Sequence, residues 1–416
     1  MRLPLALALL LAAAAAADEV WLKNGSMIEG DVTERGAKVE VTVSGGTMTI
    51  DRASVDHIVR KESRADEYAR RAAEVADKDV EGHRALAQWC DGKGLPTEAR
   101  RELEAVLRLR PDDPDARRAL GFVKIMGRWV AISQEWTEVA TEHFSIRTDT
   151  GRAEEIAAIL EAGTRAFLDA YGRDFVKRGV EEPYSALIFR NRDQFVAKLK
   201  ECYPDSPQAA AGFAEVVNGF SLPVDRVMLL HMPEDAPTDG VETLLHEMTH
   251  LLFYDLAVPD DVTRGLTEQE IQERLVDGRG LKWWHEGFAS YFGGSTVQRT
   301  SIHVGDFPSG GVASRLAKLA AKAIDEGKAI PLGTLVEGGV AEFTGPDCLL
   351  YYAESWSLVH FLHEGLEGKM RPAVGRIGQL VAQGEGGREG LERALKVSIE
   401  DLAPAWRLYV KELAQR

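Results

Sequence analysis

Over residues 18–61, apolar and polar residues alternate in short runs that are separated by turn-forming residues. A period of two is typical of strands that bury one face. Asn24-Gly25 and Gly45-Gly46 are residue pairs that favour tight hairpin turns. The pattern therefore predicts a small all-β barrel of five strands, at residues 20–22, 27–33, 38–43, 48–50 and 55–59.

The pattern changes to helical spacing over residues 62–128, which are rich in Ala, Arg, Glu and Leu. Leu86-Ala87 and Leu120-Gly121 are 34 residues apart, which is the period of a tetratricopeptide repeat (TPR). The segment resembles about one and a half such repeats, although His83 and Cys90 stand where the signature Trp and Tyr would be. A plain helical hairpin is the alternative interpretation. The preceding barrel is similar to SH3-like or Sm-like modules, and either segment offers a surface for a protein partner.

Strands and helices mix from residue 129 to residue 416, which predicts an α+β domain and makes the chain multidomain. Strands are expected at 143–148, 184–189 and 227–230, and a long amphipathic helix at 153–171. The tail from residue 365 is expected to be helical with a glycine-rich break at 384–390. Trp406 and Tyr409 are expected to anchor its core.

Composition and charge limit where the protein acts. Residues 1–17 contain Met1-Arg2, an apolar run and six alanines that end at Ala17, which is the pattern of a cleaved signal peptide. A signal anchor is the alternative, but about fifteen apolar residues are short for a membrane span. We therefore expect an exported protein, periplasmic or secreted, with no stable membrane anchor. A net charge of −16 argues against nucleic acid as a partner, and three cysteines allow one disulfide at most.

The segment Leu245-His246-Glu247-Met248-Thr249-His250 carries the strongest chemical signal in the chain. Residues i and i+4 of an α-helix lie on one face, so His246 and His250 can bind one metal ion together. Glu247 projects about 100° around the axis, where it can accept a proton from water that the metal activates. This is the H-E-x-x-H pattern of zinc hydrolases. Two ordinary helix histidines are the alternative, but the uncharged flanking residues make their burial costly without a metal or another partner.

A second motif offers a candidate for the third ligand that a catalytic zinc ion needs. Residues 283–291 read W-x-x-E-G-x-A-x-Y, with Glu286 as the acid. The two motifs together resemble gluzincin zinc metallopeptidases of the M1-like peptidase MA group, and most closely the exported bacterial DUF1570 family. The resemblance covers roughly Trp136 to the C-terminus. It implies a zincin-like metallopeptidase fold, Zn²⁺ held by His246, His250 and Glu286, and Glu247 as the general base.

The chain also departs from this family. His285 is a rival third ligand, although it lies about 100° from Glu286 on a helix. The segment 256–280 lengthens the distance between the motifs, and it carries a capping box at Thr267-x-x-Glu270. It is either a lid or a passive surface insertion. Ser290 stands where some gluzincins have an acid that orients a zinc histidine, so the partner of that histidine stays open.

A third block, residues 351–362, resembles the helix of M1-type enzymes whose tyrosine binds the tetrahedral intermediate. Tyr352 fits that role, with Tyr351 in reserve, and a pair of core aromatics is the alternative. His360 and His363 have a spacing that can bind metal, but two ordinary buried histidines are the favoured interpretation.

These observations predict an exported zinc-dependent peptidase that acts on peptides or proteins. No G-x-M-E-N block, which holds the substrate amine in M1 aminopeptidases, precedes the first motif. We therefore expect an endopeptidase or processing enzyme rather than an aminopeptidase. The alternative is an inactive, metal-stabilised scaffold that binds partners through the barrel or the TPR-like helices.

Overall fold

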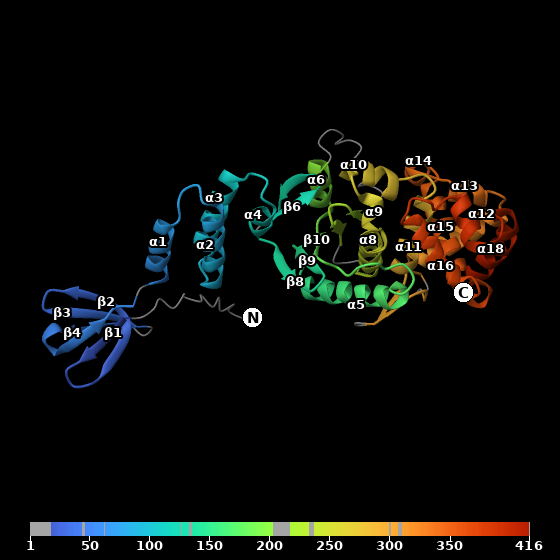
Figure 1. Ribbon diagram of the computed structural model, residues 1–416. Coiled ribbons are helices and arrows are strands. Elements are labelled where there is room, and N and C mark those ends of the chain that lie inside the picture. Colours follow the sequence, from blue (N-terminus) through green and yellow to red (C-terminus); the bar gives the residue numbers. More distant parts are fainter. Residues whose placement is uncertain are drawn as a thin grey trace, which may run out of the picture. The chain divides into compact units, whose positions relative to one another are not determined.

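A computed structural model describes most of the chain as a mixture of helices and small sheets (Figure 1). The described residues are 18–43, 46–61, 63–125, 127–132, 135–202, 217–232, 237–298, 301–306 and 310–415. The predicted signal peptide, residues 1–17, lies outside them. The chain divides into two compact units, one ending at Phe122 and the other beginning at Val123.

The first unit contains the five predicted strands. They are β1 (Asp18–Leu22), β2 (Met27–Arg35), β3 (Lys38–Val43), β4 (Gly46–Asp51) and β5 (Val55–Val59). They form one antiparallel sheet in the order β4-β3-β2-β1-β5, with a core of valines that includes Val20, Val39 and Val41.

The prediction of a closed barrel is wrong for this sheet. In the described part of the chain β4 pairs with β3 and β5 pairs with β1, so the two strands form opposite edges that do not meet. Closure depends on strand tilt and stagger, and a period-two pattern encodes neither.

The same unit contains helices α1 (Arg64–Glu74), α2 (Val80–Gly92), α3 (Pro96–Leu109) and α4 (Pro114–Ala119). Helices α2 and α3 pack against each other, and Leu86, Cys90 and Ala99 are buried between the helices. Glu102 is buried as well, and it accepts hydrogen bonds from Tyr68 at 2.5 Å and His83 at 2.6 Å. The helical prediction is confirmed, whereas the TPR resemblance stays a prediction.

The second unit is built on a mixed five-stranded sheet. Its order is β11-β12-β10-β9-β8, where β9, β10 and β12 are parallel and the two edge strands are antiparallel. The strands are β8 (Thr137–Ala140), β9 (Phe144–Thr148), β10 (Tyr184–Phe189), β11 (Gly219–Leu222) and β12 (Val227–His231). A short hairpin of β6 (Phe122–Ile125) and β7 (Arg128–Ala131) precedes them. The predicted strands are confirmed.

Helices cover both faces of this sheet. Alternate residues of β10, such as Ala186 and Ile188, pack in one core with α5 (Ala153–Tyr171) and α8 (Pro237–Ala257). Leu187 and Phe189 point to the other face, where they pack with α6 (Arg192–Cys202). Burial on both faces explains why β10 is an almost unbroken apolar run.

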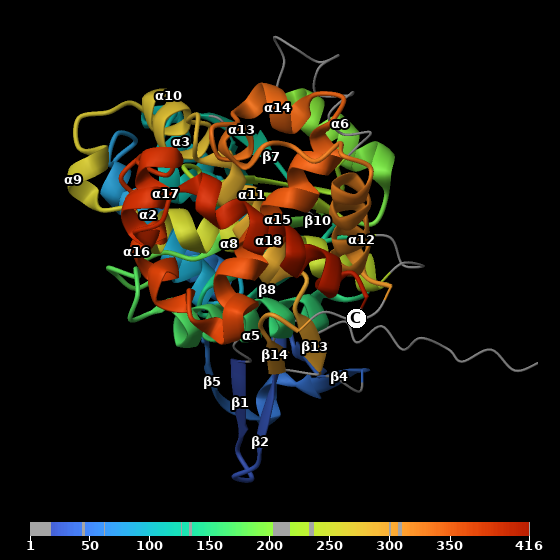
Figure 2. The same cartoon turned by 90° about the vertical axis from the view of Figure 1, so that its right-hand side faces the viewer.

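Helix α8 lies between the sheet and a group of C-terminal helices, and Figure 2 looks onto that group. The longer members are α11 (Lys282–Gly293), α12 (Val312–Asp325), α15 (Cys348–Glu364), α16 (Arg371–Val381), α17 (Arg388–Leu395) and α18 (Ile399–Leu413). Shorter elements connect them, namely α9 (Asp260–Thr263), α10 (Glu268–Ile271), a π-helical turn (Gln272–Val276), β13 (Thr296–Gln298), β14 (Ser301–His303), α13 (Leu332–Val336) and α14 (Val340–Thr344). The predicted break at 384–390 falls between α16 and α17, and Trp406 and Tyr409 are buried on α18 as expected.

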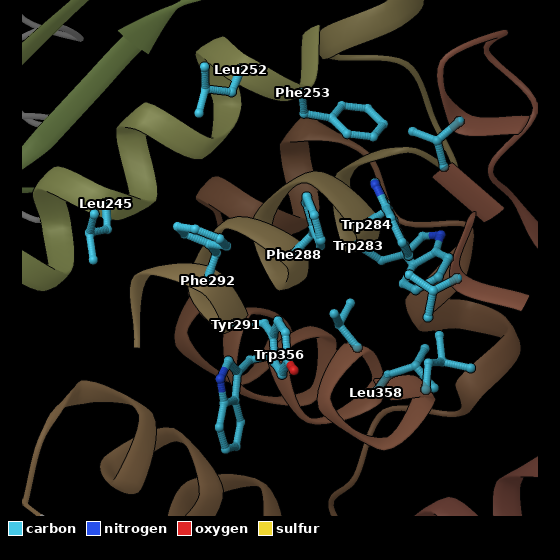
Figure 3. Close-up of a cluster of buried hydrophobic side chains, with 14 of the residues drawn as sticks. Leu245, Leu252, Phe253, Trp283, Trp284, Phe288, Tyr291, Phe292, Trp356 and Leu358 are labelled. Atoms are coloured by element: carbon cyan, nitrogen blue, oxygen red, sulfur yellow. The ribbon is translucent and has the colours of Figure 1, made fainter. Parts of the chain in front are cut away.

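Helix α11 packs between α8 and α15 (Figure 3). Its large side chains, including Trp284 and Phe288, are fully buried there. Two glycines allow the close approach. A Cβ atom on Gly293 would lie 2.8 Å from the Glu242 carbonyl oxygen of α8, and one on Gly287 would lie 2.6 Å from the Ser355 carbonyl oxygen of α15. The backbone contacts therefore fix the position of α11.

We predict that Gly287→Ala forces α11 and α15 apart. A methyl group at 2.6 Å from a backbone oxygen has no flexible neighbour to displace. The free energy of unfolding should fall by about 1–3 kcal/mol in urea denaturation. Gly151→Ala is the matched control, because nothing lies within 4 Å of its Cβ position. Equal stability of the two variants would contradict the packing argument.

Glu354 on α15 gives a second prediction. It is fully buried, its oxygens accept from the Ile330 backbone N–H at 3.1 and 3.3 Å, and burial raises its pKa to about 8. The folded protein therefore holds a proton that the unfolded chain, with a pKa near 4.5, releases earlier. The free energy of unfolding should fall as pH rises between these values, by roughly 1.4 kcal/mol per pH unit, and level off above about 8. Glu354→Gln should lack this slope in urea titrations, and parallel curves would overturn the assignment.

Candidate metal centre

Helix α8 presents the two histidines of the first motif on one face. The Nε2 atoms of His246 and His250 are 3.1 Å apart, and both rings are partly exposed. The opposite faces of the helix are buried, with Leu244, Leu245 and Leu251 completely covered. The apolar flanks thus hold the helix in the core and leave the histidine face accessible.

Glu286 on α11 completes a three-donor cluster. Its Oε2 atom is 3.4 Å from Nε2 of His246 and 3.5 Å from Nε2 of His250. Within the described ranges these three residues are the group of His, Cys, Asp or Glu that can hold a metal ion. Donors at about 2.0–2.1 Å from a tetrahedral zinc ion are about 3.3–3.4 Å apart. The donor types and their separations therefore fit Zn²⁺.

His285, the rival ligand, points elsewhere. Its Nε2 atom is 2.9 Å from the Leu275 carbonyl oxygen, to which a neutral imidazole donates. Burial lowers the pKa of His285 to about 3, helped by the nearby His250 and Lys282. The geometry therefore favours Glu286 over His285.

Glu247 lies beside the cluster without joining it. Its side chain is buried against β11, where a Cβ atom on Gly219 would be 2.9 Å from Oε1 of Glu247. Burial alone would lower the pKa of His246, but Glu286 and Glu247 hold it above its usual value. Gly219 thus leaves the room that the Glu247 carboxylate occupies.

Tyr352 on α15 is the tyrosine that reaches this centre. Burial, the charges of Glu286 and Glu247, and a hydrogen bond with Glu286 hold its pKa well above the usual value, so the phenol keeps its proton. Tyr351 instead packs its ring against Phe343, at 5.3 Å between centroids. Of the two, Tyr352 therefore has the position of a neutral hydrogen-bond donor.

Ser290 contacts the first histidine. Its Oγ atom is 3.4 Å from Nδ1 of His246, one turn along α11 from Glu286. This long hydrogen bond is weaker than one to a carboxylate. The sequence left this partner open, and the structure places the serine hydroxyl there.

Two residues near Glu286 were missed by the sequence analysis. The Nζ atom of Lys282 is 3.0 Å from Oε1 of Glu286 and 3.5 Å from Oδ1 of Asp277. Burial works against the charged form of Glu286, yet Lys282 and the two histidines hold its pKa well below the usual value. The i,i+4 spacing of Lys282 and Glu286 on a predicted helix was the signal that could have revealed the pair.

The segment 256–280 packs beside α11. The predicted capping box is confirmed, because Thr267 and Glu270 exchange both hydrogen bonds at the start of α10. The Lys124 Nζ atom lies 2.7 Å from Oε1 of Glu268 and ties the segment to β6. Leu275 and Asp277 then contact His285 and Lys282 of α11.

His360 and His363 have ordinary partners in the core. Nδ1 of His360 is 2.7 Å from the Tyr409 hydroxyl, and Nε2 of His363 is 3.0 Å from the Tyr171 hydroxyl. Burial lowers the pKa of His363 to about 3. The interpretation as buried core histidines is confirmed.

Comparison with protein-family models and with curated proteins finds no match to this chain. The gluzincin and DUF1570 resemblance therefore stays a prediction that rests on the motifs. No helix in the part of the chain that the structure describes is long and apolar enough to cross a membrane. Cys90 and Cys348 are both free thiols.

Metal analysis of purified variants tests the ligand set. We expect one zinc ion per chain in the wild type and almost none in His246→Ala or Glu286→Ala, because each loses a donor of the cluster. His285→Asn is the matched control, since it changes the rival ligand and should keep its zinc. If Glu286→Ala kept its zinc and His285→Asn lost it, the third ligand would be wrongly assigned.

Proposed function

We propose that this chain is a zinc-dependent peptidase of the gluzincin type. The observation that carries the proposal is the convergence of three donor atoms, from His246, His250 and Glu286, next to a buried carboxylate and a neutral phenol. This combination suits hydrolysis, since it joins a metal site to an acid–base group and to a donor for the oxyanion.

Glu247 is the general base. When bound, zinc would lower the pKa of a water molecule and polarise the scissile carbonyl. Glu247 accepts the proton of the attacking water and returns it to the nitrogen of the leaving amine. The Glu247 side chain lies between the histidine face of α8 and Gly219 of β11. Glu247 is therefore close to the three donor residues but is not one of them.

Tyr352 stabilises the transition state. The carbonyl oxygen gains negative charge as water attacks, and a fixed neutral donor lowers the energy of that charge. The pKa of Tyr352 is held far above neutrality, so its hydroxyl keeps the proton that it donates.

The substrate is an extended peptide that lies along β11. Within the described residues β11 is one of the two edge strands of the sheet, and it is the edge at which Gly219 leaves room for the Glu247 side chain. An edge strand binds extended backbone through its unpaired N–H and C=O groups. A substrate bound in this way contacts the enzyme on both sides of the scissile bond. Such contacts support an endopeptidase or processing enzyme over an aminopeptidase.

The proposed enzyme acts outside the cytoplasm. The signal-peptide pattern of residues 1–17 supports export to the periplasm or the exterior. The N-terminal sheet and the helices α1–α4 would then bring a protein partner or substrate to the peptidase part.

Two conservative variants test the chemistry. Glu247→Gln should keep its zinc but lose activity by more than about 10²-fold, because the amide cannot accept the proton. Tyr352→Phe should lower kcat by about 10²–10³-fold, whereas Tyr351→Phe, its matched control, should change little. The assay is digestion of a broad peptide library, with and without a chelator. Zinc binding without chelator-sensitive cleavage would favour the scaffold alternative.

A further inference from the structure

The two oxygens of the Glu286 carboxylate face the histidines and a lysine, and the carboxylate also accepts a hydrogen bond from Tyr352. Oε2 lies 3.4 and 3.5 Å from the ring nitrogens of His246 and His250. Oε1 lies 3.0 Å from the ammonium of Lys282, one helical turn earlier on α11. The lysine therefore occupies the oxygen that a second metal bond would need.

Lys282 is itself held by the segment 256–280. Asp277, at the end of the π-helical turn, lies 3.5 Å from its Nζ atom, and the second oxygen of Asp277 accepts from the Gln272 side chain at 2.9 Å. The Asp277 N–H also bonds to the Gln272 carbonyl at 2.8 Å, the i→i+5 contact of a π turn. The acid therefore has a fixed position next to the lysine.

Energetics favour a specific role over an accidental contact. The side chains of Lys282 and Glu286 are 14% and 7% exposed, and an ammonium so covered is costly unless it is paired. An apolar residue at position 282 would avoid the cost of burying this ammonium. The orientation of a ligand affects how it binds its metal. An ammonium fixed on one oxygen of Glu286 therefore affects how many oxygens of that carboxylate can bind the metal.

We propose that Lys282 is a positioning residue that restricts Glu286 to a one-oxygen ligand, and that Asp277 of the segment 256–280 holds Lys282 in place. This inference rests on the proposed zinc site. A zinc catalyst needs an open coordination position for water. With Oε1 engaged by the lysine, Glu286 fills one position and the next stays open. The segment 256–280 is then a support for the third ligand and neither a lid nor a passive insertion.

Cobalt(II) is the probe, because four-coordinate cobalt absorbs visible light more strongly than five- or six-coordinate cobalt. Apo full-length protein is titrated with cobalt, and its spectrum and zinc affinity are recorded. The wild type should show the strong bands. Lys282→Met should bind cobalt yet lose most of this absorption, as Glu286 binds through both oxygens. Its kcat with zinc should fall about 10- to 100-fold. Lys282→Arg should restore the bands.

Two further variants make the test decisive. Lys322→Met is the matched control, because Lys322 forms the same i,i+4 pair with Glu326 at 3.8 Å on an exposed helix face. It should leave the spectrum unchanged. Asp277→Asn removes a carboxylate that is 36% exposed, and it should weaken the bands in the same direction as Lys282→Met. If Lys282→Met does not fold, the spectrum of Asp277→Asn tests the positioning role in its place.

The outcomes separate the two proposals. A wild type that binds neither zinc nor cobalt overturns the proposed function. A wild type that binds cobalt with strong bands, together with unchanged spectra in Lys282→Met and Asp277→Asn, overturns the positioning role alone.

Discussion

The close crossing of α11 with α8 and α15 is the constraint on which the candidate site depends. Gly293 and Gly287 bring the backbones into contact, where a side chain would collide with carbonyl oxygens of the neighbouring helices. The histidines come from α8, Glu286 from α11 and Tyr352 from α15. Because donor atoms on two helices must meet within about 3.4 Å to share a zinc ion, the helices have to be fixed to a fraction of an ångström. Rigid packing of large aromatics around α11 provides that precision.

Electrostatics then explains what this packed arrangement can accommodate. The facing Nε2 atoms of His246 and His250 bring two ring nitrogens to 3.1 Å, and Glu286 adds a buried carboxylate. Lone pairs and negative charge at such distances repel unless a proton or a metal ion lies between them, and the raised pKa of His246 is one expression of this. Lys282 neutralises only Oε1 of Glu286, the oxygen that faces away from the histidines. The three inner donors still face one another, and a divalent ion would satisfy all of them at once.

The sequence predicted what depends on local spacing. The i,i+4 histidines, the capping box at Thr267, the five strands of the first sheet and the three parallel strands of the second follow from periodicity and short motifs, and the structure confirms them. Closure of the first sheet, the contact of Ser290 and the Asp277–Lys282 pair depend on how distant segments meet. A π-helical turn that aims Asp277 at α11 has no sequence signature, because it arises from packing of the whole segment.

The composition of the centre bears on whether its metal would be structural or catalytic. Structural zinc is closed by four protein ligands, whereas catalytic zinc keeps a position for water. The described cluster has three donors, and its two histidines keep solvent access. The Glu247 carboxylate is costly to bury, and neither it nor the partly buried Tyr352 is needed to hold the ion. A scaffold gains nothing from a covered carboxylate and a neutral phenol beside its metal, whereas a hydrolase needs both, so their presence together supports catalysis over a purely structural role.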